Sequence, residues 1–431
     1  MLTPTSRRRG VLAGAAALGA LALSGCNRSK PLTPAFTKDG LAKLRAGLER
    51  HIARGYAPGV VALISRGDQT HILPLGTKAF GDPTPMPRDA LFRIASMTKA
   101  VTAAAVLMLV ADGKLRLDEP VDRLLPELAD RKVLKRIDGP LGDTVPAKRP
   151  ITVEDLLSFR EGFGIVFAEP GSTPLLRAIE GLQIVGFGPP NPSQPFGPDE
   201  WMKRLGTLPL MHQPGERWMY TTGSDIQGVL IARASGKTLP AFFQERILGP
   251  LGMKDTGFAV PQEKLGRLVP AYRQETGQVV ASDLPTASRW AQEPLFPEGD
   301  SGLVSTAEDY LAFARLLLAE GMYGDKRLLS DASVRAMTSD HLTPAQRTDP
   351  AAAAILSKGR GWGYGVSVVS EPVPDGPPLD AFGWNGGFGA SWISDPRNDL
   401  TAILLTQREF ESADPPAIHK EFWAATYRAL G

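Results

Sequence analysis

The sequence predicts an α/β (α+β) domain, with a mainly antiparallel β-sheet flanked by helices and a helical lobe inserted between its first and last strands. Strand-like alternation occurs near the N-terminus and returns late in the chain. Between these regions, residues 115–295 show mostly helical patterning that is broken by Pro and Gly clusters. The 431 residues are 43% hydrophobic and 22% charged, so the chain can bury a sizeable core.

The composition argues against several classes of partner. The formal net charge is only +2, which offers no general electrostatic attraction for nucleic acid. The five histidines are far apart in the sequence, and none forms an H-E-x-x-H or similar metal-ligand spacing. We therefore expect no nucleic acid, no metal and no cofactor.

The N-terminus has the parts of an export signal over residues 1–25. The basic run Arg7–Arg9 precedes a short apolar stretch, which is too short for a comfortable membrane span of roughly 20 residues. The following Leu-Ser-Gly-Cys resembles a bacterial lipobox in which Cys26, the only cysteine, is lipidated. We expect an exported lipoprotein, anchored to a membrane through Cys26 and facing the periplasm or cell exterior. The alternative is an uncleaved anchor helix.

The folded domain is expected over residues 37–431, after a polar, Pro-containing tether at 26–36. A first helix is predicted at 36–54, because apolar residues recur there on one helical face. Two strands joined by a turn follow at 59–65 and 70–76. The apolar face of the helix consists of Leu41, Leu44, Leu48 and Ile52.

The run 96–111 is apolar nearly all round, which is typical of a buried helix that ends before Gly113. The helical lobe is expected over about 111–295. The α/β part then comprises about 37–110 and 296–431.

Strand-like alternation returns late in the chain, at 363–370, 389–395 and 400–407, and a closing helix follows at 422–430. The lobe contains a long Pro- and Gly-rich loop at 186–198. A loop of this length is suited to lining a binding site.

Ser96 and Lys99 form the only S-x-x-K sequence in the chain. Residues three apart share a helical face, so the amine can reach the hydroxyl. Burial disfavours a charged Lys and thus predicts a lowered pKa for Lys99, which could then act as a base toward Ser96. The plain alternative is a Ser N-cap beside an incidental Lys.

Several segments in order resemble the serine β-lactamase and penicillin-binding-protein superfamily, in the class C-like branch close to family VIII carboxylesterases. The segments are "LFRIASMTKAV", "ITVEDLLSFREGF", "PGERWMYTTGSDIQG", "GDSGLVSTAEDY" and "FGWNGGFGASWISDP". The resemblance covers about residues 40–425. It implies a β-lactamase/transpeptidase-like fold and a serine hydrolase.

The resemblance also implies roles for individual residues. Ser96 corresponds to the acyl-accepting nucleophile, and Lys99 is its partner. Tyr220 falls where the family's Y-x-N motif places a proton-relaying tyrosine. The backbone N–H groups of Ser96 and Gly387 correspond to the oxyanion hole.

The sequence departs from the family pattern at two positions beside the expected site. Thr222 replaces the Asn of Y-x-N, and Trp384 replaces the Lys of the Lys-Thr-Gly strand that pairs with a β-lactam carboxylate. The resemblance assigns Thr222 and Trp384–Asn385–Gly386 to substrate binding. Gly386 and Gly387 are expected where the strand passes the substrate closely.

We therefore expect a small-molecule ester or acyl substrate, cleaved through an acyl-enzyme on Ser96. The alternatives are β-lactamase or D-Ala-type peptidase or transacylase activity, and an inactive binding or scaffolding lipoprotein. One further pattern, Ser224 followed by Gln227, is interpreted as a capping box that starts a helix.

Overall fold

The structure is a computed structural model that describes residues 36–166, 168–184, 194–373 and 376–431. The predicted export signal, its Cys26 and nearly all of the tether lie outside the described residues, as does most of the loop 186–198.

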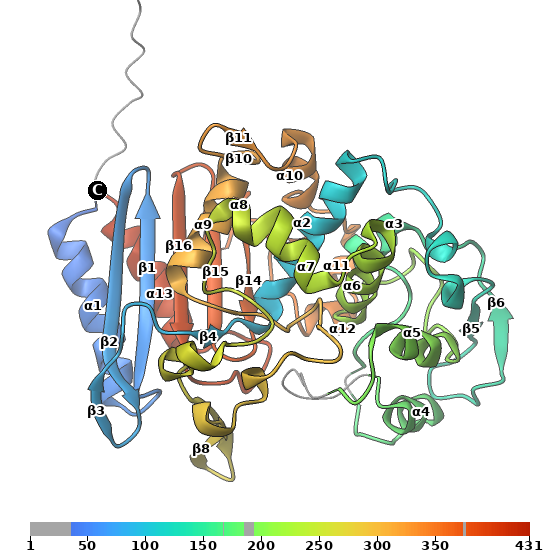
Figure 1. Ribbon diagram of the computed structural model, residues 1–431, viewed down its shortest axis with the longest axis horizontal. Helices are drawn as coiled ribbons and strands as arrows, with labels where there is room; N and C mark the ends of the chain where they lie inside the picture. Colours follow the sequence, from blue (N-terminus) through green and yellow to red (C-terminus); the bar gives the residue numbers. More distant parts are fainter. Residues whose placement is uncertain (1–35, 167, 185–193, 374–375) are drawn as a thin grey trace, which may run out of the picture. The chain divides into compact units, whose positions relative to one another are not determined.

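The domain contains an antiparallel sheet of eight strands, in the order β12-β13-β14-β15-β16-β1-β2-β3. The strands from β14 to β3 are labelled in Figure 1, where the inserted region lies to one side of the sheet. The early strands and the late strands meet where β1 pairs with β16, with Val60 opposite Thr406. The predicted antiparallel sheet is thus confirmed. Its strands are β1 Gly59–Arg66, β2 Gln69–Ala79, β3 Asp82–Pro85, β12 Arg360–Trp362, β13 Ser367–Val369, β14 Phe382–Gly386, β15 Ala390–Asp395 and β16 Leu400–Thr406.

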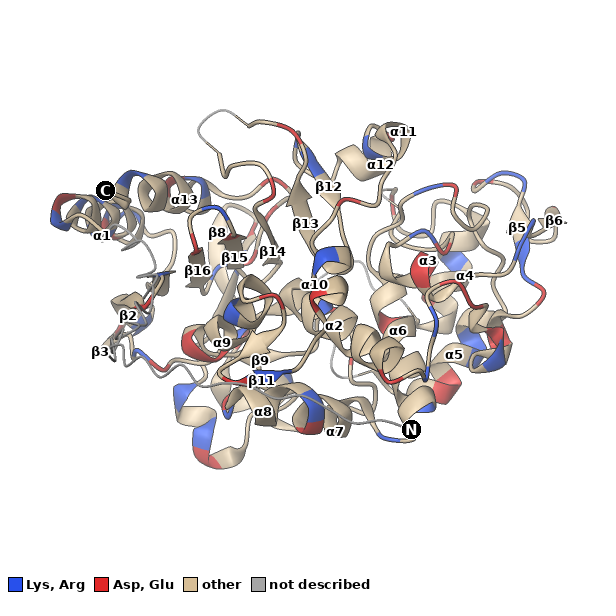
Figure 2. Cartoon of the chain, turned by 90° about the horizontal axis from the view of Figure 1, so that it is seen from above, with Lys and Arg blue, Asp and Glu red and all other residues tan. Residues whose placement is uncertain are grey.

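Helices cover both faces of this sheet. The first and last helices, α1 Lys38–Ala53 and α13 Ala417–Ala429, pack together on one face (Figure 2). Leu44 and Leu48 of α1 are buried there against the sheet, as the spacing predicts. The opposite face carries α2 Thr98–Ala111 and α9 Ala307–Leu318, in the main core cluster.

Helix α2 is buried along almost its whole length, and the 3₁₀ turn Ala95–Met97 leads into it. The apolar run explains this burial, because the helix has no polar face. Gly113 follows the helix with φ +68°, the left-handed conformation predicted for it. The prediction that the helix begins at Ser96 is wrong by two residues. Ser96 lies in the 3₁₀ turn, and its side chain is no N-cap.

The inserted region is less purely helical than expected. Among the described residues it carries six α-helices and several short 3₁₀ turns, but also the hairpins β5/β6 and β7/β8. The bounds are α3 Val153–Leu157, α4 Pro174–Leu182, α5 Pro198–Gly206, α6 Thr222–Ser235, α7 Leu239–Phe243, α8 Gly249–Leu251, β5 Lys132–Leu134, β6 Thr144–Pro146, β7 Ala271–Glu275 and β8 Gln278–Asp283.

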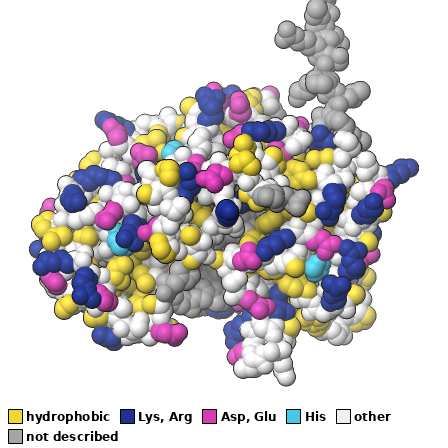
Figure 3. Space-filling view, turned by 180° about the vertical axis from the view of Figure 1, so that it is seen from behind, with side chains coloured by type: hydrophobic (Ala, Val, Ile, Leu, Met, Phe, Trp, Pro, Cys, Tyr) yellow, Lys and Arg dark blue, Asp and Glu magenta, His cyan; other side chains and the backbone are white. Residues whose placement is uncertain are grey.

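The remaining elements are short and lie around the core. They are β4 Phe92–Arg93, β9 Val304–Ser305, β10 Met322–Tyr323, β11 Lys326–Arg327, α10 Asp331–Met337, α11 Pro344–Arg347 and α12 Pro350–Ala353. Basic and acidic side chains are interspersed over the face shown in Figure 3. Within the described ranges no helix is both long and apolar enough to cross a membrane, and no group of side chains is suited to hold a metal ion.

Candidate active site

A cavity of about 550 Å³ lies where the turn before α2, the start of α6 and strand β14 come together. Ser96, Tyr220 and Trp384 all line it, although up to 288 positions separate them in the sequence. One part of the wall is apolar, with Trp201 and Phe296 stacked on each other. The structure therefore brings the main predicted site residues into one hollow.

The turn that presents Ser96 has a strained backbone. Ala95 has φ +43°, a conformation that is uncommon for a residue with a side chain. Strand β14 packs closely beneath this turn at Gly386, where a Cβ atom would lie 2.1 Å from the carbonyl oxygen of Ile94. The turn and the strand thus fix each other, and Ser96 remains partly exposed at the cavity wall.

Lys99 is fully buried, and its amine is bonded from three directions. The Nζ atom lies 3.2 Å from Ser96 Oγ, 3.1 Å from the Asp300 carbonyl oxygen and 3.4 Å from Asp300 Oδ2. It also lies 4.6 Å from the centroid of the Tyr220 ring, over the ring face. The spacing of three residues therefore brings the amine to the hydroxyl as predicted.

The predicted lowering of the Lys99 pKa is wrong. Burial does lower the pKa of this amine, but the charge of Asp300, together with Tyr220 and Asp225, outweighs burial and raises the pKa above its usual value. Lys99 is therefore an ammonium at neutral pH. It donates its hydrogen bond to Ser96 Oγ and cannot accept the Ser96 proton in this state.

Asp300 is the site residue that the sequence analysis missed. The loop that carries it is tied to α2, since Thr102 Oγ1 donates to the Gly299 carbonyl and the Leu303 amide donates to Thr98 Oγ1. The signal was present in the quoted segment "GDSGLVSTAEDY", in which an acidic residue stands between small ones. Its partner in space lies 201 residues earlier in the chain, so only the fold reveals the contact.

A second carboxyl lies behind Asp300. Asp225, near the start of α6, accepts a hydrogen bond of 3.1 Å from the Asp300 backbone amide. Burial raises the pKa of Asp225 well above its usual value, and the charges of Asp300 and Glu298 raise it further. This carboxyl therefore responds to any change of charge at Asp300.

Tyr220 is held by its backbone and by aromatic neighbours. Its carbonyl accepts from the Ile165 amide, and its ring makes an edge contact with Phe159. The indole nitrogen of Trp384 lies 2.6 Å from the Tyr220 hydroxyl oxygen and donates to it, since an indole N–H cannot accept. The next residue, Thr221, has φ +91° and occupies the N-cap position directly before helix α6.

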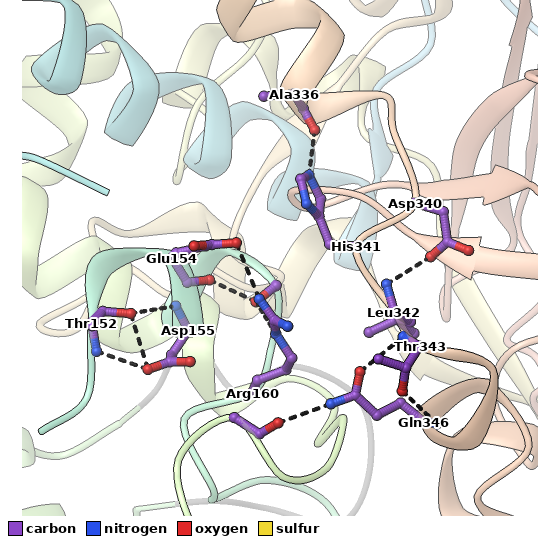
Figure 4. A network of polar contacts seen from close by, with 12 residues as sticks. Thr152, Glu154, Asp155, Arg160, Ala336, Asp340, His341, Leu342, Thr343 and Gln346 are labelled. Carbon is purple, nitrogen blue, oxygen red and sulfur yellow. Dashed lines mark hydrogen bonds and ion pairs between the residues drawn. The ribbon is translucent and has the colours of Figure 1, made fainter. Parts of the chain in front are cut away.

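A polar network fixes the segment Phe159–Gly162 through Arg160 (Figure 4). This segment stands where the family often has His-Thr-Ser-Gly. Arg160 bonds to Glu154 at 3.2 Å and to Ser158 at 2.8 Å. A second capped segment, with Gln346 bonded to the Gly215 carbonyl, lies next to it in the figure. The network fixes the segments that support Tyr220 and contributes no group to the cavity itself.

The strand that carries the departure from the family pattern forms one wall. Trp384, Asn385 and Gly387 line the cavity, and β13 pairs only with the first two residues of β14, so the rest of this edge faces the hollow. Gly387 is exposed, and a Cβ atom on it would meet nothing within 4 Å. Its position beside the Ser96 turn is compatible with the predicted pair of backbone donors from Ser96 and Gly387.

Thr222 and Gly386 do not line the cavity, so their roles in substrate binding stay predictions, whereas the cap expected at Ser224 needs correction. Thr222 is fully buried inside α6 and does not line the cavity, because the turn at Thr221 directs that residue there instead. Gly386 does not line it either, since its close approach is to Ile94. The capping-box interpretation of Ser224 is wrong: the N-cap is Thr221, and Gln227 donates to the Leu156 carbonyl.

Comparison with known proteins relates this chain to one family over nearly its whole domain. The family described as Beta-lactamase matches residues 45–422. Protein Rv1367c of Mycobacterium tuberculosis is 38% identical over 397 residues, covering 88% of this chain and 96% of that protein. Esterase EstB of Burkholderia gladioli is 30% identical over 396 residues, covering 87% of this chain and 92% of EstB.

Among solved structures, one described as EstCE1, a hydrolase with promiscuous acyltransferase activity, superposes with a TM-score of 0.74. The match covers 90% of this chain and 99% of EstCE1, with 23% sequence identity, and therefore bears on the fold alone. The predicted β-lactamase/transpeptidase-like fold and the resemblance to that superfamily are confirmed.

Proposed function

This chain belongs to the beta-lactamase family, and we propose that within it the protein is a serine hydrolase that cleaves carboxylic esters through an acyl-enzyme on Ser96. The observation that carries the proposal is the 3.2 Å contact between Lys99 Nζ and Ser96 Oγ inside a cavity that Tyr220 also lines. A serine needs such an activating neighbour, because its hydroxyl is a weak nucleophile by itself.

The raised pKa of Lys99 determines how the proton moves. Lys99 stays an ammonium, orients Ser96 Oγ and stabilises negative charge that develops on it. Tyr220 takes the Ser96 proton while it gives its own hydroxyl proton to the leaving alcohol oxygen. The bond from Ser96 Oγ to the acyl carbon forms and the bond to the alcohol oxygen breaks. Water then reverses the relay, releasing the acid and restoring Ser96.

The indole at position 384 favours an ester over a β-lactam. Its single N–H is already donated to Tyr220, so it can neither pair with a substrate carboxylate as the Lys of β-lactamases does nor supply a positive charge. The name of the relative EstB, an esterase, points the same way. β-Lactamase and D-Ala peptidase activities are the alternative outcomes of a substrate comparison.

The test combines an active-site label with a substrate comparison. A fluorophosphonate probe should label the wild-type protein and the Ser412→Ala variant, in which another cavity serine is removed, but not Ser96→Ala. Short-chain p-nitrophenyl esters should turn over much faster than a chromogenic cephalosporin or a D-Ala-D-Ala peptide. Labelling of Ser96→Ala would refute the nucleophile, and the opposite ranking of substrates would make the β-lactamase or peptidase reading the correct one.

The predicted lipid anchor is a separate proposal. We propose that Cys26 carries lipid and holds the enzyme on a membrane facing the periplasm or cell exterior. Radiolabelled palmitate should be incorporated into the wild-type protein and not into Cys26→Ala. Incorporation into both proteins would contradict the lipobox.

A further inference from the structure

One residue of the cavity has a charge that the proposed reaction does not use. Arg360, the first residue of β12, is the only Lys or Arg among the described residues that line the cavity. It pairs with Val369 of β13, whose amide bonds in turn to the Ala381 carbonyl just before β14. Arg360 is thus level with the start of β14, whereas Ser96 packs on the other end of that strand.

Among the residues that the structure describes, no carboxylate pairs with the guanidinium of Arg360, and the Tyr427 hydroxyl of α13 is the one titratable group whose charge acts on its pKa. Burial lowers the pKa of Arg360 to about 10, so the group is still charged at neutral pH. The side chain is partly buried at the cavity wall, where an anion from outside the chain can pair with its charge.

The acidic groups of the cavity are engaged elsewhere. Asp300 pairs with Lys99, Glu411 lies 2.8 Å from Arg408, and Glu409 accepts from a serine hydroxyl. Asp225 accepts from the Asp300 amide, and Glu298 accepts from the Ser301 hydroxyl. None of these contacts involves Arg360. The cavity wall near it is apolar, with Ile393 and Trp423 packed in one small cluster with Val369. A guanidinium surrounded in this way is suited to bidentate binding of a carboxylate.

We propose that the cavity contains a second subsite, at Arg360, which binds a carboxylate at the far end of an elongated ester. This inference rests on the proposed esterase function and adds a substrate class to it. Six residues of strand, roughly 20 Å, separate the level of Ala381, where Arg360 lies, from Gly387 beside Ser96. The arginine side chain can shorten this distance by its own length. The reacting carbonyl and the carboxylate are therefore separated by roughly 10 to 20 Å.

A binding experiment tests the subsite without requiring turnover. Isothermal titration of Ser96→Ala compares monomethyl dodecanedioate with the methyl ω-hydroxy ester of the same length, in which a hydroxyl replaces the carboxylate. We expect the carboxylate to bind about 10- to 100-fold more tightly, as for a hydrogen bond to a charged group. The short monomethyl succinate, which cannot span the distance, should show no dependence on Arg360.

Two variants test whether the preference for the carboxylate depends on Arg360. In the Ser96→Ala background, Arg360→Met should abolish the preference for the carboxylate, and Arg360→Lys, which keeps the charge, should retain part of it. The matched control Arg54→Met, at an exposed position after α1, should change nothing. Equal affinity for the two long esters, or a preference that survives Arg360→Met, would overturn the proposal. If Arg360→Met does not fold, the affinity of Arg360→Lys for the carboxylate and the comparison of the two long esters test the proposal instead.

A kinetic experiment separates this proposal from the esterase function. The p-nitrophenyl half-ester of dodecanedioic acid should show a KM about 10-fold higher in Arg360→Met than in the wild type, with kcat little changed. The corresponding neutral diester should show no such difference. If the wild type hydrolyses neither ester, the proposed function fails, while the titration of Ser96→Ala still decides the subsite.

Discussion

Replacing Asp300 by Asn tests the electrostatic description of Lys99, because it removes one charge and keeps the shape of the side chain. Asp300 Oδ2 lies 3.4 Å from Lys99 Nζ. At this distance an effective dielectric constant of about 20 gives an attraction of about 5 kcal/mol, so removal of the Asp300 charge should lower the pKa of Lys99. The backbone carbonyl of residue 300 still accepts from the amine in the variant.

Part of this loss is compensated inside the site. Asp300 raises the pKa of Asp225, so removing the Asp300 charge lets Asp225 ionise more readily and supply a replacement charge. We therefore expect the pKa of Lys99 to fall in Asp300→Asn by less than the loss of the Asp300 attraction alone would cause. The double variant Asp225→Asn/Asp300→Asn should show a larger fall.

The measurement is NMR of the lysine Cε signals in protein labelled with ¹³C-lysine, titrated from neutral to alkaline pH. The Lys99 signal is assigned by its absence from Lys99→Arg. The wild-type signal should remain that of an ammonium past the usual lysine pKa of about 10.4. Asp68→Asn, in the exposed turn between β1 and β2, should behave like the wild type. An unchanged or higher pKa in Asp300→Asn would refute the reasoning.

Three further predictions concern the support of the site. Gly386→Ala should reduce kcat/KM at least about 100-fold and destabilise the fold by about 1 to 3 kcal/mol, because the new Cβ atom would overlap the Ile94 carbonyl. The control Gly387→Ala should keep the wild-type Tm, so equal Tm values for the two variants would contradict the prediction. Trp384→Phe removes the donor to Tyr220 and should lower kcat about 5- to 30-fold with KM nearly unchanged in p-nitrophenyl ester assays, so a change confined to KM would count against it. Burial raises the pKa of Glu161, so the folded protein keeps a proton that the unfolded chain loses above a pH of about 4.3. As the pH rises, the free energy of unfolding of the wild type should therefore fall by about 1.4 kcal/mol per pH unit relative to Glu161→Gln, until the pKa of the folded state is reached. Urea denaturation at several pH values measures this, and parallel stability curves for the two proteins would refute it.

The sequence by itself determined the local elements and the pairing of Ser96 with Lys99. Periodicity is a property of neighbouring residues, so the first helix, the buried apolar helix and the late strands follow from it. The three-residue spacing of S-x-x-K sets the amine beside the hydroxyl through one turn of backbone, whether that turn is 3₁₀ or α-helical. The start of α6 was misjudged, because Ser224 fits a capping box locally while Thr221 takes the cap in the fold.

The tertiary structure alone decided the charge of Lys99 and the partners of Tyr220. Burial of a lysine predicts a lowered pKa, and the sequence does not show that Asp300, 201 residues away, reverses the sign. Likewise, the indole of Trp384 meets the Tyr220 oxygen across 164 residues of chain. Electrostatic energies depend on the distances between groups in space and on their exposure to water. These quantities are fixed only when the sheet, the turn before α2 and the start of α6 pack together.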